Sequence, residues 1–122
     1  MKYLLLINKD EARFRALTPD QRAEIEARYT EWGKRLYDSG LAEAGARLEH
    51  SDAATTVRVR SGARVITDGP FAETEEQIAG VVVIEAADLD EALDWAASHP
   101  DAEWASVEVR PVYVFKKGPV PR

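Results

Sequence analysis

The stretch AGVVVIE, residues Ala79–Glu85, predicts a fully buried central strand. It holds four apolar residues in succession, Val81 to Ile84, and such an unbroken run is typical of a strand buried on both faces. Tyr3–Asn8 is a second short apolar run, and it ends in turn-forming and charged residues. A strand with one face in water should alternate between apolar and polar residues, so we expect both faces of these two strands to be covered.

Two helices are predicted, one before this stretch and one after it. Thr18–Gln21 combines a capping threonine, a proline suited to the first helical position and the glutamine of a capping box. Gly40 ends this helix, while Asp88 and Glu91 frame a second capping box before a helix that stops at His99-Pro100. An apolar stripe runs along the first helix at spacings of four, three and four residues: Ile25, Tyr29, Trp32 and Leu36.

The remaining segments complete an α+β domain. Leu41–Leu48 is either a weak strand or a return loop. Thr55–Arg60 alternates with a period of two, and we expect it to pair across Ser61-Gly62 with Arg64–Ile66 as a hairpin. Ser106–Phe115 is a last strand. The order strand, helix, hairpin strands, strand, helix, strand predicts a ferredoxin-like antiparallel sheet with two helices on one face.

The length of 122 residues fits a single domain, which we place at residues 1–115, with a flexible C-terminal tail at 116–122. Two helices can cover only one face of the sheet, whereas the apolar runs require cover on both. A monomer would then expose more apolar surface than soluble monomers usually tolerate. We therefore predict a homodimer in which the sheets of two copies pack face to face.

Composition narrows the classes of function. Lys and Arg total 16 against 22 Asp and Glu, and the net charge of -6 argues against direct binding to nucleic acid or to an anionic membrane. The absence of cysteine excludes thiol catalysis and disulfides. The opening MKYLLLIN is too short for a signal-peptide core, so a cytoplasmic protein is expected.

Thr67–Thr74 is the segment with the most distinctive chemistry, and it contains Asp68, Gly69, Pro70, Phe71 and Glu73. Asp-Gly-Pro is turn chemistry in itself, so a tight turn after a strand is one interpretation. The other is a site at which the Asp68 carboxylate, in an apolar mouth beside Phe71 and Glu73, has a raised pKa and transfers protons. Both interpretations place polar groups at a sheet edge, where pockets often form.

Charge is segregated along the chain. Ten acidic residues and no Lys or Arg lie between Glu73 and Glu103, a pattern typical of a solvated face. Arg58 and Arg60 share one strand face, so with Arg47 or Arg110 nearby they could hold a carboxylate ligand in a bidentate fork. They could equally pair with the acidic stretch.

Neither histidine suggests a metal site. His50 lies in a polar loop, and His99 is explained as a residue at a helix C-terminus. The sequence has no glycine-rich phosphate loop, nucleophile elbow or dinucleotide motif, so no metal and no cofactor is predicted.

The segment Val65–Gln77 resembles the motif of the DGPF-type branch of the YCII-related family of small bacterial proteins. The resemblance extends over about Met1 to Phe115 and is carried by four further segments: Met1–Ile7, Thr55–Arg58, Asp88–Ala96 and Val107–Val112. It implies a ferredoxin-like fold that dimerises into an α+β barrel. Relatives in that wider group are small lyases, isomerases and monooxygenases that act on small organic molecules without a cofactor or with haem.

The chain departs from the family pattern at three points. YCII proteins are proposed to use a His-Asp pair in the pocket, and here no histidine falls at a matching position. Glu75 stands where relatives commonly have Lys, and Ala79 where they have Gly.

Relatives of the DGPF type are often encoded near extracytoplasmic-function sigma factors, which suggests a regulatory association.

Two hypotheses about function remain open. In the first, a dimer binds a small organic acid near the Asp-Gly-Pro-Phe turn and transforms it by lyase- or isomerase-type proton transfer. Asp68 is then the acid or base, Arg58 holds the anion, and Gly69, Pro70, Phe71 and Glu73 line the site. In the second, the protein is a non-enzymatic ligand-binding or regulatory module that contacts a transcription factor through its acidic face. Whether the chain is an enzyme, and which ligand it takes, is left open.

Overall fold

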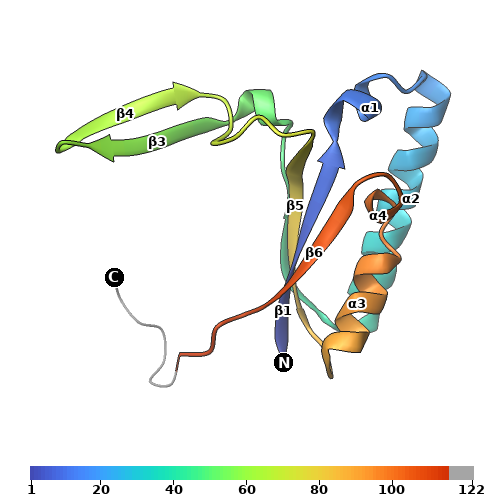
Figure 1. Ribbon diagram of the computed structural model, residues 1–122. Coiled ribbons are helices and arrows are strands. Elements are labelled where there is room, and N and C mark those ends of the chain that lie inside the picture. The colour runs from blue at the N-terminus through green and yellow to red at the C-terminus, as the bar shows by residue number, and fades with distance from the viewer. Residues whose placement is uncertain (116–122) are drawn as a thin grey trace.

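The computed structural model describes residues 1–115, and the predicted tail at 116–122 lies outside the described residues. The elements follow one another in an order that has strands at both ends (Figure 1). They are β1 (Lys2–Asp10), α1 (Glu11–Arg15), α2 (Pro19–Ser39), β2 (Ala42–Arg47), the 3-10 turn η1 (Ser51–Ala53), β3 (Thr55–Arg60), β4 (Ala63–Asp68), β5 (Glu76–Glu85), α3 (Leu89–Ala97), α4 (Asp101–Trp104) and β6 (Ser106–Pro111).

The main sheet is antiparallel with the strand order β2-β5-β1-β6. The helices α2 and α3 lie against one face of it (Figure 1). The prediction of a ferredoxin-like sheet with two helices on one face is therefore confirmed. The segment Leu41–Leu48 supplies the edge strand β2 rather than a return loop. The last strand ends at Pro111 instead of reaching Phe115, and one further backbone hydrogen bond follows it, from the N–H of Val112 to the carbonyl of Lys2 at 3.0 Å.

The predicted hairpin forms, but it does not join the main sheet. β3 and β4 pair only with each other, from Thr55 opposite Asp68 to Arg60 opposite Ala63. Ser61 and Gly62 both have positive φ, 51° and 78°, as a type I′ turn requires. We call residues 55–68 the arm. It extends away from the body on the side of the sheet opposite the helices (Figure 1), and the expectation that its strands belong to the sheet is wrong.

Helix capping places α2 and α3 over the sheet as the sequence predicts. Thr18 accepts a hydrogen bond from the backbone N–H of Gln21, whose side chain accepts one from the N–H of Thr18. Asp88 accepts from the N–H of Glu91 at 2.9 Å. The core between helices and sheet is built mainly from Leu5 and Ile84 of the strands and Trp32, Leu36 and Ala92 of the helices. None of the helices in the described part of the chain is long and apolar enough to cross a membrane.

The two faces of the sheet differ in what covers them. On β1, residues Tyr3, Leu5, Ile7 and Lys9 are buried beneath the helices. Leu4 and Leu6 point to the other face, where they lie opposite Val83 and Val81 and are only half-buried. We call Leu4, Leu6, Val81 and Val83 the open face. The sheet is therefore apolar on both faces, and within one chain only the helix side is covered.

Candidate functional site

The structure places the residues of the Asp-Gly-Pro-Phe segment at the base of the arm. Asp68 is exposed at the end of β4, and Gly69 has a φ of 102°, which suits glycine. The guanidinium of Arg58 donates to the carbonyl of Phe71 at 3.5 Å, and the Phe71 ring is 76% exposed. Glu73 is also exposed. Pro70 and Phe71 line an open groove of about 730 Å³ together with Leu48, Val57 and Ile78, among others.

The other arginines of the expected fork have partners of their own. Arg47 is paired with Glu26, and Arg110 is paired with Glu108 on the same strand. Arg58 is thus the arginine that lies beside the Asp-Gly-Pro-Phe turn, and the structure gives Arg47 and Arg110 different neighbours.

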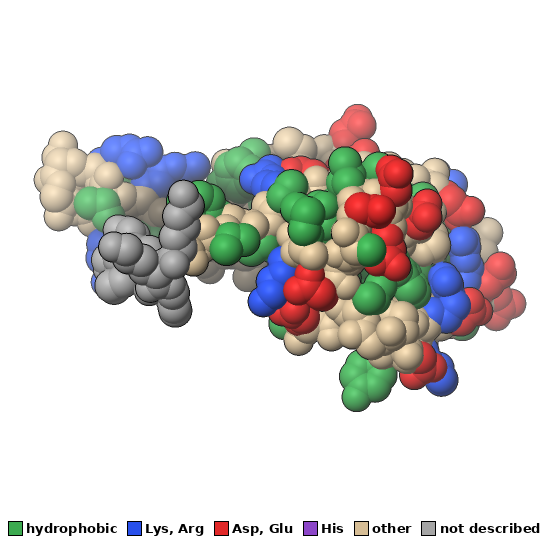
Figure 2. All heavy atoms as spheres, turned by 90° about the horizontal axis from the view of Figure 1, so that it is seen from below, with side chains coloured by type: hydrophobic (Ala, Val, Ile, Leu, Met, Phe, Trp, Pro, Cys, Tyr) green, Lys and Arg blue, Asp and Glu red, His purple; other side chains and the backbone are tan. Residues whose placement is uncertain are grey.

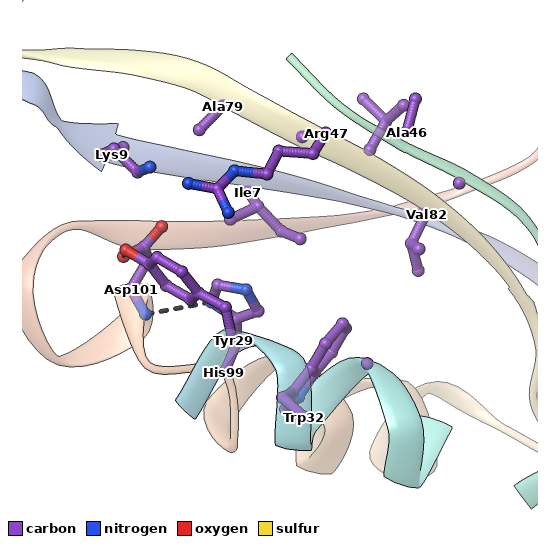
Figure 3. Close-up of a pocket in the computed structure, with 14 residues that line it drawn as sticks. Ile7, Lys9, Tyr29, Trp32, Ala46, Arg47, Ala79, Val82, His99 and Asp101 are labelled. Carbon is purple, nitrogen blue, oxygen red and sulfur yellow. Dashed lines mark hydrogen bonds between the residues drawn. The ribbon is translucent and has the colours of Figure 1, made fainter. Parts of the chain in front are cut away.

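A second cavity, of about 280 Å³, lies between the helix-covered face of the sheet and α2 (Figure 3). We call it the helix-side cavity. Ile7, Gly45 and Val82 contribute to the strand wall, and Trp32 and Gly33 to the helix wall. Its polar lining comes from five side chains: Lys9, Tyr29, Arg47, His99 and Asp101. Figure 3 shows Lys9 and Arg47 entering from the strands, while Tyr29 and Trp32 face them from α2.

Glycines make room for this cavity. A Cβ on Gly45 would come within 2.6 Å of the Val82 side chain, so a larger residue would push β2 away from β5. Gly33 lies inside α2, where glycine is unfavourable by about 1 kcal/mol relative to alanine. A Cβ at position 33 would meet nothing within 4 Å, so this glycine leaves space at the wall instead of filling it.

His99 is held in one orientation and one tautomer. Its Nδ1 accepts a hydrogen bond from the backbone N–H of Asp101 at 3.0 Å, so in the neutral ring the proton is on Nε2. The ring lies against Tyr29, with centroids 5.6 Å apart, and edge-on to Trp32 at 4.7 Å. Burial and the positive charge of Lys9 lower the pKa of His99 to about 4. His99 is therefore a neutral hydrogen-bond donor at physiological pH.

Asp101 and Tyr29 form a buried hydrogen-bonded pair. The hydroxyl of Tyr29, on α2, donates to Oδ1 of Asp101 at 2.6 Å. Asp101 is 2% exposed, and burial raises the pKa of its carboxyl above the usual range. The pKa of Tyr29 is also raised, first by burial and then by the hydrogen bond to Asp101, so the tyrosine stays protonated. A carboxylate with a raised pKa in a mostly apolar cavity is suited to accepting a proton.

Two cations lie close to this pair, and they differ in how they are held. Arg47 donates from both terminal nitrogens to the two carboxylate oxygens of Glu26, at 2.6 and 2.8 Å. That fork lowers the pKa of Glu26 and raises the pKa of Arg47. Lys9 has no carboxylate oxygen within 4.0 Å among residues 1–115. Its Nζ lies over the rings of Phe14 and Tyr29, 4.1 and 5.1 Å from their centroids.

The arrangement is equipped for acid-base chemistry. One buried carboxylate can take a proton, one neutral imidazole N–H can donate a hydrogen bond, and a cation is near both. Among residues 1–115, no group of three or more His, Asp and Glu side chains is placed to hold a metal ion.

Sequence analysis missed most of this cavity. The interpretation of His99 as a residue at a helix C-terminus is incomplete, because His99 follows the C-cap Ser98 and its ring is buried. Asp101 belongs to the acidic stretch from Glu73 to Glu103, but its burial separates it from a solvated face. Lys9 carried a usable signal: it continues the series Tyr3, Leu5, Ile7 of helix-facing positions on β1.

Comparison with known proteins places the chain in a family. The model of the YCII-related domain matches residues 1–116. The uncharacterised protein R00369 of Rhizobium meliloti (strain 1021) is 35% identical over 123 residues, which is 99% of each chain.

Solved structures with a similar fold include 5-chloro-2-hydroxyhydroquinone dehydrochlorinase (TftG) of Burkholderia phenoliruptrix AC1100, in complex with 2,5-dihydroxybenzoquinone. The TM-score is 0.55 at 13% identity, over 96% of this chain and 98% of that one. At this identity the likeness concerns the fold. With a domain model that covers nearly the whole sequence and a relative of the same length, the chain belongs to the YCII-related family.

Proposed function

We propose that this protein is an enzyme that moves protons on a small organic molecule held in the helix-side cavity. The observation that carries the proposal is the buried carboxylate of Asp101, which has a raised pKa and lines the same cavity as the neutral imidazole of His99. Elimination and isomerisation are the reaction types that need only these groups.

Asp101 is the base in this proposal. Its carboxylate takes a proton from a carbon next to a carbonyl group, and the electron pair of the broken C–H bond moves onto the carbonyl oxygen. His99 donates a hydrogen bond from Nε2 to that oxygen and keeps its proton. Nε2 has no hydrogen-bond partner among the described residues, and His99 lines the cavity. Return of the proton to another atom completes an isomerisation, whereas departure of a leaving group with the electron pair completes an elimination.

The fold neighbour gives this reaction class independent support. TftG is named as a dehydrochlorinase and was solved with 2,5-dihydroxybenzoquinone. Loss of hydrogen and chlorine from one molecule is an elimination, and the bound compound is a single ring. A cavity of about 280 Å³ with the apolar walls Ile7, Trp32 and Val82 has room for a ring of that size.

We propose a homodimer as the working assembly. The open face leaves Leu4, Leu6, Val81 and Val83 half-buried in a single chain. On the same side of the sheet, one face of the arm carries Val57, Val59 and Ile66, which are 55 to 59% exposed. A second copy packed on this side would cover both sets of residues. An interface of about 1,000 Å² or more is the size that stable dimers need.

The Asp-Gly-Pro-Phe turn remains a separate candidate for ligand binding, and one experiment distinguishes it from the helix-side cavity. Binding is measured by NMR for a panel of ring compounds with hydroxyl and keto groups, beginning with 2,5-dihydroxybenzoquinone. Turnover is followed as carbon-bound hydrogen exchanged for deuterium in heavy water. Gly33→Leu adds a side chain at the cavity wall and should abolish binding, while Asp68→Asn should not.

Asp101→Asn keeps the shape of the site and removes the base, so binding should persist while exchange falls about a hundredfold or more. Two results would contradict the proposal. One is binding that survives Gly33→Leu and is lost in Asp68→Asn, which would locate the ligand at the turn. The other is a panel in which no compound shows saturable binding or exchange.

A further inference from the structure

We propose that the ammonium group of Lys9 is a subsite for a single negatively charged oxygen, so that the ligand is a phenolate or an enolate and not a carboxylate. The inference rests on the helix-side cavity being the ligand site, as proposed above, and it names the substrate class of that site.

Lys9 is an unusual lysine because it is buried without a carboxylate partner. Its side chain is 5% exposed, and its helix-facing position at the end of β1 directs it into the space beneath α2. The contacts of Nζ are the faces of Phe14 and Tyr29, which attract a cation but accept no conventional hydrogen bond. The ammonium group therefore retains donors that these protein contacts do not use.

Such a cation is unfavourable in an empty site. Taking an ammonium group out of water has a large desolvation cost, and two aromatic faces offset only part of it. Burial and the nearby Arg47 both lower the pKa of Lys9, and the carboxylates of Asp101, Glu26 and Glu11 oppose this shift only in part. An anionic oxygen that enters the cavity would supply the missing acceptor.

The choice of anion follows from the contrast with Arg47. A carboxylate is best held by the two parallel N–H groups of a guanidinium, but both terminal nitrogens of Arg47 already bind Glu26. Lysine is a compact point charge that suits one oxygen. The cavity walls Ile7, Trp32 and Val82 favour an apolar body on the ligand.

This subsite also fits the proposed chemistry. When Asp101 removes a proton from carbon, the negative charge moves to an oxygen of the ligand. An ammonium group fixed in advance at that oxygen stabilises the charge as it forms. Lys9 would then hold the oxygen together with the N–H of His99, and a phenolate would bind as a stable analogue of the enolate.

The test uses three probes that share one ring: 4-nitrophenol, whose phenolate is coloured and whose neutral form is not, nitrobenzene and 4-nitrobenzoate. The native protein should bind the phenolate more tightly than the other two and increase the ionised fraction of nitrophenol at fixed pH. Lys9→Met should weaken phenolate binding about tenfold or more, the range expected for a lost hydrogen bond to a charge, and leave nitrobenzene within twofold. Lys9→Arg keeps the charge and should restore part of the phenolate affinity.

The variants are first checked for folding by circular dichroism. Equal loss of phenolate and nitrobenzene in Lys9→Met would overturn the inference, as would tighter binding of nitrobenzoate or no saturable phenolate binding by the native protein. Asp101→Asn separates this inference from the proposed function. If the phenolate still needs Lys9 while exchange activity is the same in native protein and Asp101→Asn, the subsite stands and the assigned base is wrong.

Discussion

The two faces of the main sheet each carry residues that their surroundings disfavour. Beneath the helices, the apolar core is interrupted by the charged side chains of Lys9 and Asp101 together with His99. The face that a single chain leaves open holds Leu4, Leu6, Val81 and Val83. Charges buried in a cavity have a function to serve, because burial disfavours them. Apolar residues left in water indicate a partner. We therefore propose that the reaction takes place under the helices and that the second copy packs on the open face.

Neighbouring valines of β5 provide the sharpest test of this contrast. Val82 points to the helix side, where it lines the cavity and packs over Gly45. Val83 lies on the open face opposite Leu4. Val82→Lys should lower the free energy of unfolding by about 3 kcal/mol or more, because it places an unpaired charge against the hydrophobic core. Val83→Lys should leave each chain folded and separate the two copies.

Sedimentation at low micromolar concentration measures the second effect, and chemical denaturation the first. The native protein should sediment at twice 13.6 kDa and Val83→Lys at 13.6 kDa. A native protein that is a well-folded monomer at that concentration would show that the open face needs no partner.

A pH titration of stability tests the helix side. His99 has an ordinary pKa of 6.5 and a pKa of about 4 in the fold, so folding favours the neutral ring. Between these values the unfolded chain binds a proton that the folded protein does not. The contribution of His99 to stability is therefore fully present above pH 6.5. As the pH decreases to 4, the free energy of unfolding should fall by about 3 kcal/mol.

His99→Asn is the matched control, because an asparagine oxygen can replace Nδ1 as acceptor for the Asp101 N–H but does not titrate. The decrease in the free energy of unfolding between pH 6.5 and 4 should be smaller in this variant. The same pH dependence in both proteins would mean that His99 ionises as freely in the fold as in water.

Lys9→Met provides a prediction of opposite sign. The substitution removes a buried charge that has no carboxylate within 4.0 Å in the described part of the chain and keeps a side chain of similar length. We expect the free energy of unfolding to rise by about 1 kcal/mol, since apolar replacements of buried charges are often stabilising. Lys34→Met is the control, because Lys34 is an exposed lysine of α2 and its change should be near zero. A Lys9→Met variant less stable than native would assign Lys9 to the fold instead of the ligand.

How far the sequence could predict these features depends on the distance between the residues involved. Strands, caps and turns depend on residues that are close in the sequence. Examples are the run Val81 to Ile84, the Thr18-Gln21 capping box and the turn Ser61-Gly62. The apolar second face also followed from the absence of alternation. The cavity instead joins β1, α2, β2, β5 and the segment after α3, and no local pattern connects Lys9 with Tyr29 and Asp101.

The hairpin shows a different limit of sequence-based prediction. The pairing of β3 with β4 could be predicted from alternation and a two-residue turn, but whether the hairpin would join the main sheet could not. Both β3 and β4 remain outside the main sheet, and the arm carries Arg58, Arg60 and Arg64 on its surface. In Figure 2 blue side chains mark the arm, while red ones are spread over the body. The sequence separates these charges as the structure does. The sequence hypothesis made Asp68, on the arm, the acid or base, whereas the function proposed here gives that role to Asp101, on the body.

Asp68→Asn carries the smallest expected effect and decides between the arm and the cavity. Asp68 is exposed and ends β4 opposite Thr55, and asparagine has similar turn preferences, so stability should change by less than about 1 kcal/mol. Because the carboxylate lies on the arm and not among the residues that line the helix-side cavity, binding of 4-nitrophenol should stay within twofold of native. Thermal unfolding and the binding titration measure the two quantities. Weaker phenolate binding at unchanged stability would mean that the turn at the base of the arm takes part in the site, because a purely structural turn residue would alter stability first.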